Sequence, residues 1–343
     1  MALVDCHADI VSYHDDEVTL PKAEQDEMRS RRDAGRTRLR TGLDKDKKPK
    51  PSEIATQGSY AMRTMVQDPE SDYDIDDGVY FSKADLTTNG VSLTPLQARE
   101  MVWHALQHDE RLKNEAKVKD NCVRQLYPQG YHIDMPVYRD NGSGQSRYEL
   151  ASKNTWAPAD GRAVTAWFTQ IVGQLNTGER DGNQLRRVVR LTKKYARSRM
   201  IWKKSMTSGL CVTKLVADHF VAQKERDDDA LLAAWKAIHQ KLKTSLRIEH
   251  PAISGTTASK GDNDAEVAFL RDKLGEALTT LAPLESSGCT KDSALACWDK
   301  VFNTSYFSRR GPKGGTGGKG GPPFVKTSGN IPSRDDGDRR FGW

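Results

Sequence analysis

The chain has 343 residues, of which 36% are hydrophobic and 29% are charged, and its formal net charge is +6. This length accommodates two compact domains with tails, and the many Trp, Tyr and Phe residues exclude a chain that is disordered throughout. No apolar run approaches the ~20 residues of a membrane-spanning helix. The N-terminus lacks a secretory signal pattern, and the five cysteines form no C-x-x-C pair. We therefore expect a soluble, cytoplasmic protein with no membrane partner.

The charges are distributed unevenly along the chain. Residues 28–50 contain ten Lys or Arg against three Asp, and residues 186–204 contain nine Lys or Arg and no acidic residue. Residues 68–77, in contrast, are strongly acidic. A chain that separates its charges in this way commonly handles phosphates, metal ions or both. Solvated helix faces are the alternative interpretation of each basic run.

The first half of the chain alternates between helical and strand-like patterns. In chain order we expect a helix at 15–46, a short helix after Gly58-Ser59, a strand at 73–81, a helix at 94–113 capped by Thr94, and strands at 116–126 and 131–138. These elements predict a mixed α/β unit that ends near residue 160.

The second half of the chain is helical and ends in a tail of different composition. Apolar residues at helical spacing predict helices at 164–175, 183–199, 208–222, 227–246, 265–281 and 292–302. Residues 311–321 contain seven glycines and cannot bury enough apolar surface to fold alone. We therefore expect a core domain with an N-terminal helix at 1–160, a helical domain at 161–308 and a flexible tail at 309–343.

Three aspartates are the candidate metal ligands. Asp74 and Asp76 lie two positions apart on a predicted strand, so their side chains point to the same side. Two neighbouring carboxylates repel each other unless a divalent cation lies between them. Asp134, flanked by apolar residues on a later strand, supplies a third carboxylate and predicts a pair of magnesium sites. The alternative is a solvated acidic turn; an EF-hand fails because Asp77 stands where the loop requires glycine.

Gly58 and Ser59 precede the carboxylate strand and are typical of a phosphate cradle. A glycine lets backbone amides approach a phosphate closely, and a serine hydroxyl at a helix N-terminus adds a donor. A Gly-Ser pair alone is a weak signal. Its order before paired aspartates and a later aspartate is more specific.

Three segments of the chain resemble a known family. Thr56-Gln57-Gly58-Ser59, the stretch Asp74–Tyr80 and the stretch His132–Tyr138 are similar to the signatures of the bacterial cGAS/DncV-like nucleotidyltransferases. These are the CD-NTases of CBASS antiphage operons, and the similarity is greatest to the DncV-type branch. The resemblance implies an α/β plus α fold: a polymerase-β-like core with a mixed twisted sheet, a C-terminal helical domain and an active site in the cleft between them.

The resemblance also implies an activity and roles for the aspartates. Family members join nucleoside triphosphates, here ATP and/or GTP, into cyclic di- or trinucleotides that activate an effector protein, and they release pyrophosphate. Asp74 and Asp76 would hold two Mg²⁺ ions, with Mn²⁺ as an alternative, and Asp134 would hold the ion that activates the attacking hydroxyl. Gly58 and Ser59 would contact the departing phosphates. We expect a monomer.

The resemblance extends more loosely to the helical half and the tail. A lysine on the predicted helix at 183–199 would bind the donor triphosphate, and Lys193 is the best match. Ser208 is the candidate for a hydroxyl residue that follows it. The tail is similar to C-termini that bind CBASS regulatory or conjugation proteins, and the apolar end Phe341-Gly342-Trp343 suggests a docking point.

Two other functions compete with this interpretation. Another polymerase-β-like transferase, acting on RNA or protein, would carry the same three aspartates, so only its product would differ. A non-catalytic RNA-binding protein would instead use residues 28–50 and 186–204. It would bind RNA in a salt-sensitive manner even without the carboxylates, and the order of the motifs disfavours it.

Overall fold

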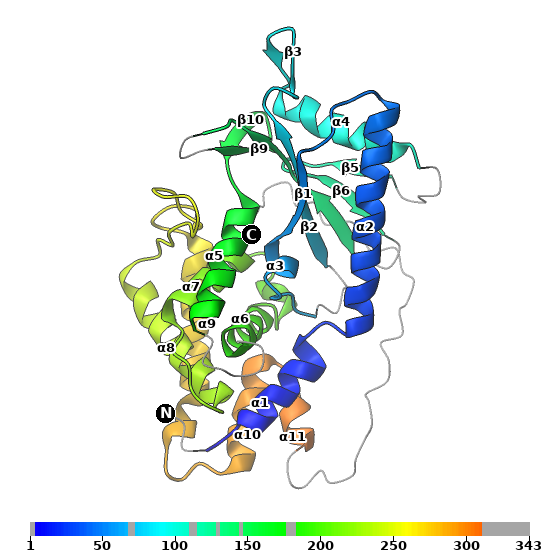
Figure 1. Ribbon diagram of the computed structural model, residues 1–343. Helices are drawn as coiled ribbons and strands as arrows, with labels where there is room; N and C mark the ends of the chain where they lie inside the picture. The colour runs from blue at the N-terminus through cyan, green and yellow to red at the C-terminus, as the bar shows by residue number, and fades with distance from the viewer. Residues whose placement is uncertain are drawn as a thin grey trace.

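The computed structural model describes residues 4–67, 73–109, 115–127, 131–143, 147–175 and 183–310. A mixed sheet with two long helices lies beside a half built from helices (Figure 1). This arrangement confirms the expected α/β plus α architecture, a core with a mixed sheet and a helical domain. Within these ranges, no helix is both long and apolar enough to cross a membrane.

The main sheet contains eight strands. They are β1 (Glu53–Gln57), β2 (Asp74–Ser82), β5 (Lys117–Val118), β6 (Val123–Leu126), β7 (His132–Met135), β8 (Val137–Asp140), β9 (Tyr148–Ser152) and β10 (Thr155–Pro158). Hydrogen bonds connect them in the order β10-β9-β8-β2-β7-β6-β5, and β1 also pairs with β2. Both β7 and β8 run parallel to β2, and the other pairs are antiparallel. A small second sheet joins β3 (Thr87–Thr88) to β4 (Val91–Ser92).

One face of β2 is packed against two helices. Ile75, Val79 and Phe81 alternate along the strand and are fully buried. They share a hydrophobic cluster with residues of α2 (Lys22–Lys45) and α4 (Pro95–Gln107). Thr94 caps α4 as predicted, and its side chain and that of Gln97 form a capping box. This apolar packing leaves the alternate residues of β2 pointing to the other face.

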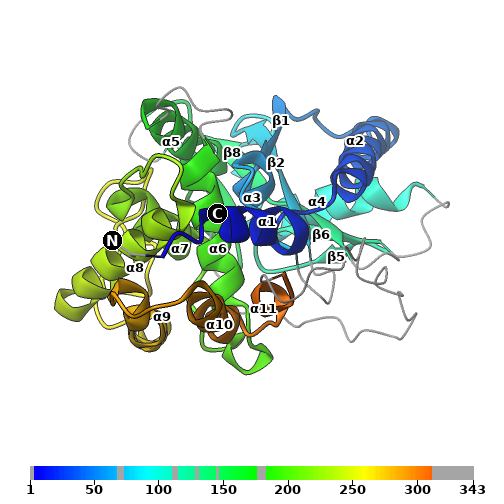
Figure 2. The ribbon, with the colours of Figure 1, turned by 90° about the horizontal axis from the view of Figure 1, so that it is seen from below.

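Within the described residues, the helical half contains seven α-helices, two short 3-10 helices (Met200–Trp202 and Ala282–Glu285) and the N-terminal segment. Its helices are α5 (Gly161–Gln174), α6 (Asn183–Ala196), α7 (Gly209–His219), α8 (Asp227–Thr244), α9 (Ala265–Leu281), α10 (Lys291–Phe302) and α11 (Tyr306–Arg310). The N-terminal α1 (His7–Tyr13) and the π-helix His14–Val18 also pack here, beside α8 and α6 (Figure 2). Cys6 and Ile10 therefore belong to the hydrophobic cluster of this half.

Most predicted elements are present, with three differences. The helix predicted at 15–46 is interrupted, because the π-helix ends at Val18 and α2 begins only after Pro21. The single strand predicted at 116–126 is wrong: a turn after Val118 folds it into the antiparallel hairpin β5–β6. The strand predicted at 131–138 pairs in parallel with β2, but it is divided into β7 and β8 at Pro136, which has no N–H to donate.

The six helices predicted in the second half are confirmed, with ends that differ by a few residues. The domain boundaries after residues 160 and 308 stay predictions. The predicted tail lies outside the described residues except for its first two positions.

Candidate active site

Four polar side chains meet on the face of the sheet that α2 and α4 do not cover. Asp74 and Asp76 come from β2, and His132 and Asp134 come from the parallel strand β7. The register places Asp74 beside His132 and Asp76 beside Asp134. Ile75, between the two aspartates of β2, is buried among residues of the opposite face. Strand pairing therefore brings the three predicted aspartates together, although Asp134 is remote in sequence.

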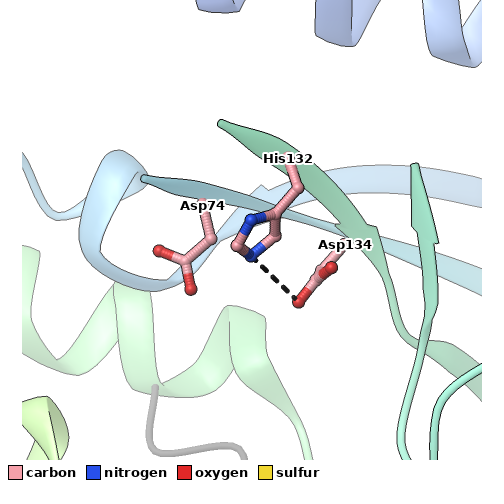
Figure 3. A group of neighbouring side chains, drawn as sticks. All are labelled: Asp74, His132 and Asp134. Carbon is pink, nitrogen blue, oxygen red and sulfur yellow. Dashed lines mark ion pairs between the residues drawn. The ribbon is translucent and has the colours of Figure 1, made fainter. Parts of the chain in front are cut away.

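Asp74, His132 and Asp134 form a group of the size that one metal ion needs. Their ligand atoms lie within 4.8 Å of one another, and His132 Nε2 is 3.8 Å from Asp134 Oδ2. Figure 3 shows the imidazole ring between the two carboxylates. His132 and Asp134 are buried, whereas Asp74 is half-buried. His132 was not among the predicted ligands, although its position two residues before Asp134 on a strand was a usable signal.

The carboxylate of Asp76 lies directly against the backbone of Gly58. β1 ends at Gln57, which faces Asp76 in the register, and the short helix α3 (Gly58–Ala61) begins at once. Gly58 has φ +68°, and a Cβ atom there would lie 2.1 Å from Asp76 Oδ2. Only glycine satisfies both conditions. Ser59 follows and is half-buried, so the Gly-Ser turn adjoins the carboxylate of Asp76 at Gly58.

Asp134 is held by an arginine on the neighbouring strand. Arg124 faces it across the antiparallel β6–β7 pair and donates two hydrogen bonds of 2.8 Å, from Nε to Oδ1 and from Nη2 to Oδ2. Such a bidentate pair sets the plane of the carboxylate and leaves a lone pair on each oxygen. Sequence patterns did not indicate Arg124, because its partner is set by the register between β6 and β7.

The electrostatic environment differs between the two buried aspartates. Burial, and then the negative charges of Asp74 and Asp134, raise the pKa of Asp76 well above its ordinary value. Burial also opposes ionisation of Asp134, but His132 and Arg124 outweigh it and lower the pKa of that carboxyl. Asp76 is therefore the carboxylate whose charge is least compensated by the protein. A bound cation would supply the missing positive charge.

Asp77, the next acidic residue of the run, has a structural role. It points to the helix-covered face and is fully buried. Arg36 of α2 donates to both of its oxygens at 2.6 and 2.5 Å, and the hydroxyl of Thr56 donates at 3.0 Å. These bonds attach α2 to the sheet, so part of the basic run at 28–50 is used inside the fold.

Lys193 and Ser208 lie close to each other in the helical half. Lys193 is 6% exposed and donates to Thr64 Oγ1 at 3.1 Å, while the amide of Thr64 donates to the carbonyl of Ser59 at 2.8 Å. Ser208 caps α7 by accepting from the amide of Cys211. A Cβ atom on Gly209 would be 3.8 Å from Lys193 Nζ. The N-terminus of α7, Lys193 and the segment after the Gly-Ser turn therefore adjoin.

Burial, with a smaller contribution from Arg197, lowers the pKa of Lys193 to about 7, and the charge of Asp74 opposes this shift. Lys193 is thus not part of a solvated basic face. Arg187 of the same helix is also engaged, in an ion pair with buried Asp227. Some basic residues of the run at 186–204 are therefore used inside the fold.

The carboxylates lie on adjacent parallel strands of a mixed sheet, next to a helical half. This arrangement is typical of the polymerase-β-like nucleotidyltransferases. Residues 52–138 match the family described as "Cyclic GMP-AMP synthase DncV-like, nucleotidyltransferase domain". This span contains Gly58, Ser59 and all three aspartates. Residues 52–138 therefore form a nucleotidyltransferase domain of the DncV-like kind.

Solved structures of similar fold extend this comparison to most of the chain. Vibrio cholerae DncV cyclic AMP-GMP synthase in complex with the linear intermediate 5′ pppA(3′,5′)pG has a TM-score of 0.67 and 16% identity, over 88% of this chain and 96% of that one. Escherichia coli DncV in its 3′-deoxy GTP bound form has a TM-score of 0.65 and 16% identity, over 85% of this chain and 93% of that one. At this identity the likeness establishes the fold.

Proposed function

We propose that the protein is a metal-dependent second-messenger synthase that joins nucleoside triphosphates, ATP and/or GTP, into a cyclic di- or trinucleotide with release of pyrophosphate. One observation carries the proposal: Asp76 faces Asp134 across parallel strands, and Asp74 adjoins them on the same face. This arrangement gives a nucleotidyltransferase the carboxylates it needs at one place. The three aspartates are the proposed catalytic and metal-binding residues.

The residues at the site fit a divalent cation. Carboxylate oxygens are the ligands that Mg²⁺ and Mn²⁺ prefer, and burial together with the charges of Asp74 and Asp134 raises the pKa of Asp76. Two such ions, when bound, stabilise the attacking and departing oxygens of an in-line displacement. Asp74 and Asp76 would hold both, and Asp134, oriented by Arg124, would hold one of them.

The triphosphate would lie between Ser59 and the helical half. Lys193 in its ammonium form supplies a positive charge, and the N-terminus of α7 with Ser208 supplies oriented donors. Thr64 connects the two sides, because it accepts a hydrogen bond from Lys193 and its amide donates to the carbonyl of Ser59. These residues would orient the departing pyrophosphate in line with the attacking hydroxyl.

The relatives support a cyclic product made from purines. The Vibrio cholerae protein is described as a cyclic AMP-GMP synthase and binds a linear pppA(3′,5′)pG intermediate. A linear dinucleotide needs only a second displacement of the same kind to close into a ring. We further propose a cytoplasmic, monomeric enzyme in antiphage defence of the CBASS type, whose product activates an effector protein. Its tail, outside the described residues, would bind a CBASS regulatory or conjugation protein.

A product assay tests the proposal directly. The purified full chain is incubated with the four labelled triphosphates and either Mg²⁺ or Mn²⁺, and the products are treated with phosphatase. A ring has no terminal phosphate, so we expect a resistant product and release of pyrophosphate. The double variant Asp74→Ala, Asp76→Ala should give neither while its circular dichroism spectrum stays unchanged. Label transferred only to added RNA or to protein would contradict the proposal in favour of another polymerase-β-like transferase.

A further inference from the structure

We propose that His132 supplies an imidazole nitrogen to the metal ion held by Asp74 and Asp134, so that this site favours Mn²⁺ over Mg²⁺. The inference rests on the proposed metal-dependent transfer and names a fourth residue of its metal centre. It concerns a buried side chain that the three-aspartate scheme leaves without a role.

The position of His132 follows from the strand geometry. It precedes Asp134 by two residues on β7, so both side chains point to one face, and its register partner on β2 is Asp74. The imidazole ring therefore lies between the carboxyl groups of Asp74 and Asp134 (Figure 3). Strand pairing, and not a movable loop, sets this placement.

The distances match the coordination sphere of one ion. Ligand atoms that each lie ~2.1 Å from an octahedral ion are at most ~4.2 Å apart. His132 Nε2 and Asp134 Oδ2 are 3.8 Å apart, which is within this limit. All three ligand atoms lie within 4.8 Å of one another, so a bound ion would need to draw them only slightly closer.

The local charges favour a neutral ligand at this position. Strand pairing already places the carboxyl groups of Asp74, Asp76 and Asp134 together, so a further carboxylate would add to the repulsion. Imidazole adds a donor atom without adding negative charge. Arg124 takes one lone pair on each oxygen of Asp134, which limits that residue to one metal bond per oxygen.

A nitrogen ligand changes which ion the site prefers. Mg²⁺ is bound almost entirely through oxygen, whereas imidazole suits transition metals. Mn²⁺ accepts both kinds of ligand. The site should therefore bind Mn²⁺ more tightly relative to Mg²⁺ than an all-carboxylate site would.

Pulsed electron paramagnetic resonance of the Mn²⁺-loaded full chain tests the assignment without depending on activity. Bound imidazole nitrogen produces a ¹⁴N modulation of the Mn²⁺ echo. We expect this modulation in the wild-type protein, its loss in His132→Asn and its retention in His104→Asn, a matched control on the exposed side of α4. Bound Mn²⁺ without ¹⁴N modulation in the wild type overturns the inference, and this result does not depend on whether any variant folds.

Displacement provides a second measurement. The Mg²⁺ concentration that releases half of the bound Mn²⁺ should fall by about tenfold in His132→Asn, because even outer-shell substitutions at metal sites cost about 10–100-fold in affinity. An unchanged midpoint contradicts the inference. Formation of a cyclic product without ¹⁴N modulation would refute the role of His132 and leave the proposed function standing. A ¹⁴N signal without any nucleotidyl product would support the role of His132 and contradict the proposed function.

Discussion

Arg124 and Asp134 face each other on adjacent antiparallel strands and form a bidentate pair with two hydrogen bonds of 2.8 Å. The pair keeps the carboxylate of Asp134 ionised and in one plane. It also places a positive charge beside a group of acidic residues that would otherwise repel one another. Arg124 is therefore a positioning residue for the proposed catalytic aspartate.

Replacing Arg124 by Gln should lower kcat for nucleotidyl transfer by about 10–100-fold with a much smaller change in KM for the nucleotide, because Asp134 loses its fixed orientation. Arg124→Lys keeps the charge but not the fork and should recover only part of kcat. The control is Arg139→Gln, since Arg139 forms a similar pair with Glu149 across β8–β9. Equal losses of kcat in the two Gln variants would contradict the positioning role.

Two neighbouring acidic residues of β2 should respond in opposite directions to the same substitution. The raised pKa of Asp76 means that its ionised form is disfavoured in the folded protein, so at neutral pH its charge costs stability. Asp76→Asn should therefore raise the free energy of unfolding of the metal-free protein by about 1 kcal/mol and abolish transfer.

Asp77→Asn should instead lower the free energy of unfolding by about 3 kcal/mol, because it breaks the buried pair with Arg36. Binding of Mn²⁺ at the site should persist in this variant at temperatures where it is folded. Urea denaturation of the two variants side by side measures both effects. Destabilisation by Asp76→Asn would argue against repulsion among the site carboxylates.

Gly58→Ala should reduce transfer by about 100-fold, because the new Cβ would displace the Asp76 carboxyl that now lies 2.1 Å from its position. Gly90→Ala is the matched control: Gly90 also has a positive φ, of +78°, but its added Cβ would meet no atom within 4 Å. Backbone strain is therefore similar in both variants. Steady-state kinetics should show full kcat in Gly90→Ala, and a comparable loss there would assign the effect to strain alone.

Nucleotide binding should take up a proton near neutral pH. The pKa of Lys193 is lowered to about 7 by burial, so at pH 8 the amine is mostly neutral in the free protein. A triphosphate beside it favours the ammonium form and raises the pKa. Affinity for a non-reactive triphosphate analogue should consequently fall as the pH rises above about 7.

Calorimetry in buffers of different ionisation enthalpy measures this proton uptake. At pH 8 the apparent binding enthalpy should vary with the buffer for the wild type. It should not vary for Lys193→Arg, whose guanidinium stays charged. Buffer-independent binding by the wild type would remove Lys193 from the triphosphate site.

The sequence predicted the parts of the site that depend on local periodicity. Alternation along residues 73–81 placed Asp74 and Asp76 on one side and Ile75 on the other, as found. The Gly-Ser pair alone was a weak signal, and it was recognisable because it precedes the paired aspartates and a later aspartate. The helices of the second half were predictable for the same reason, since each buries one apolar stripe.

Pairing between distant segments could not be read in this way. Arg124 reaches Asp134 through the register of β6 against β7, and His132 reaches Asp74 through the register of β7 against β2. In the sequence, Asp77 is one more residue of the acidic run, and nothing there indicates its buried pair with Arg36 of α2. A charge pattern does not indicate which charges are paired.

By itself, the sequence determined which side chains share a face of each strand or helix, because a side chain's direction repeats with the period of its own element. Only the tertiary structure decided which faces meet and which charges neutralise one another. Those contacts depend on strand register and helix packing, which are set by burial of the whole apolar surface. For that reason the aspartates were predictable, whereas the arginine that orients Asp134 was not.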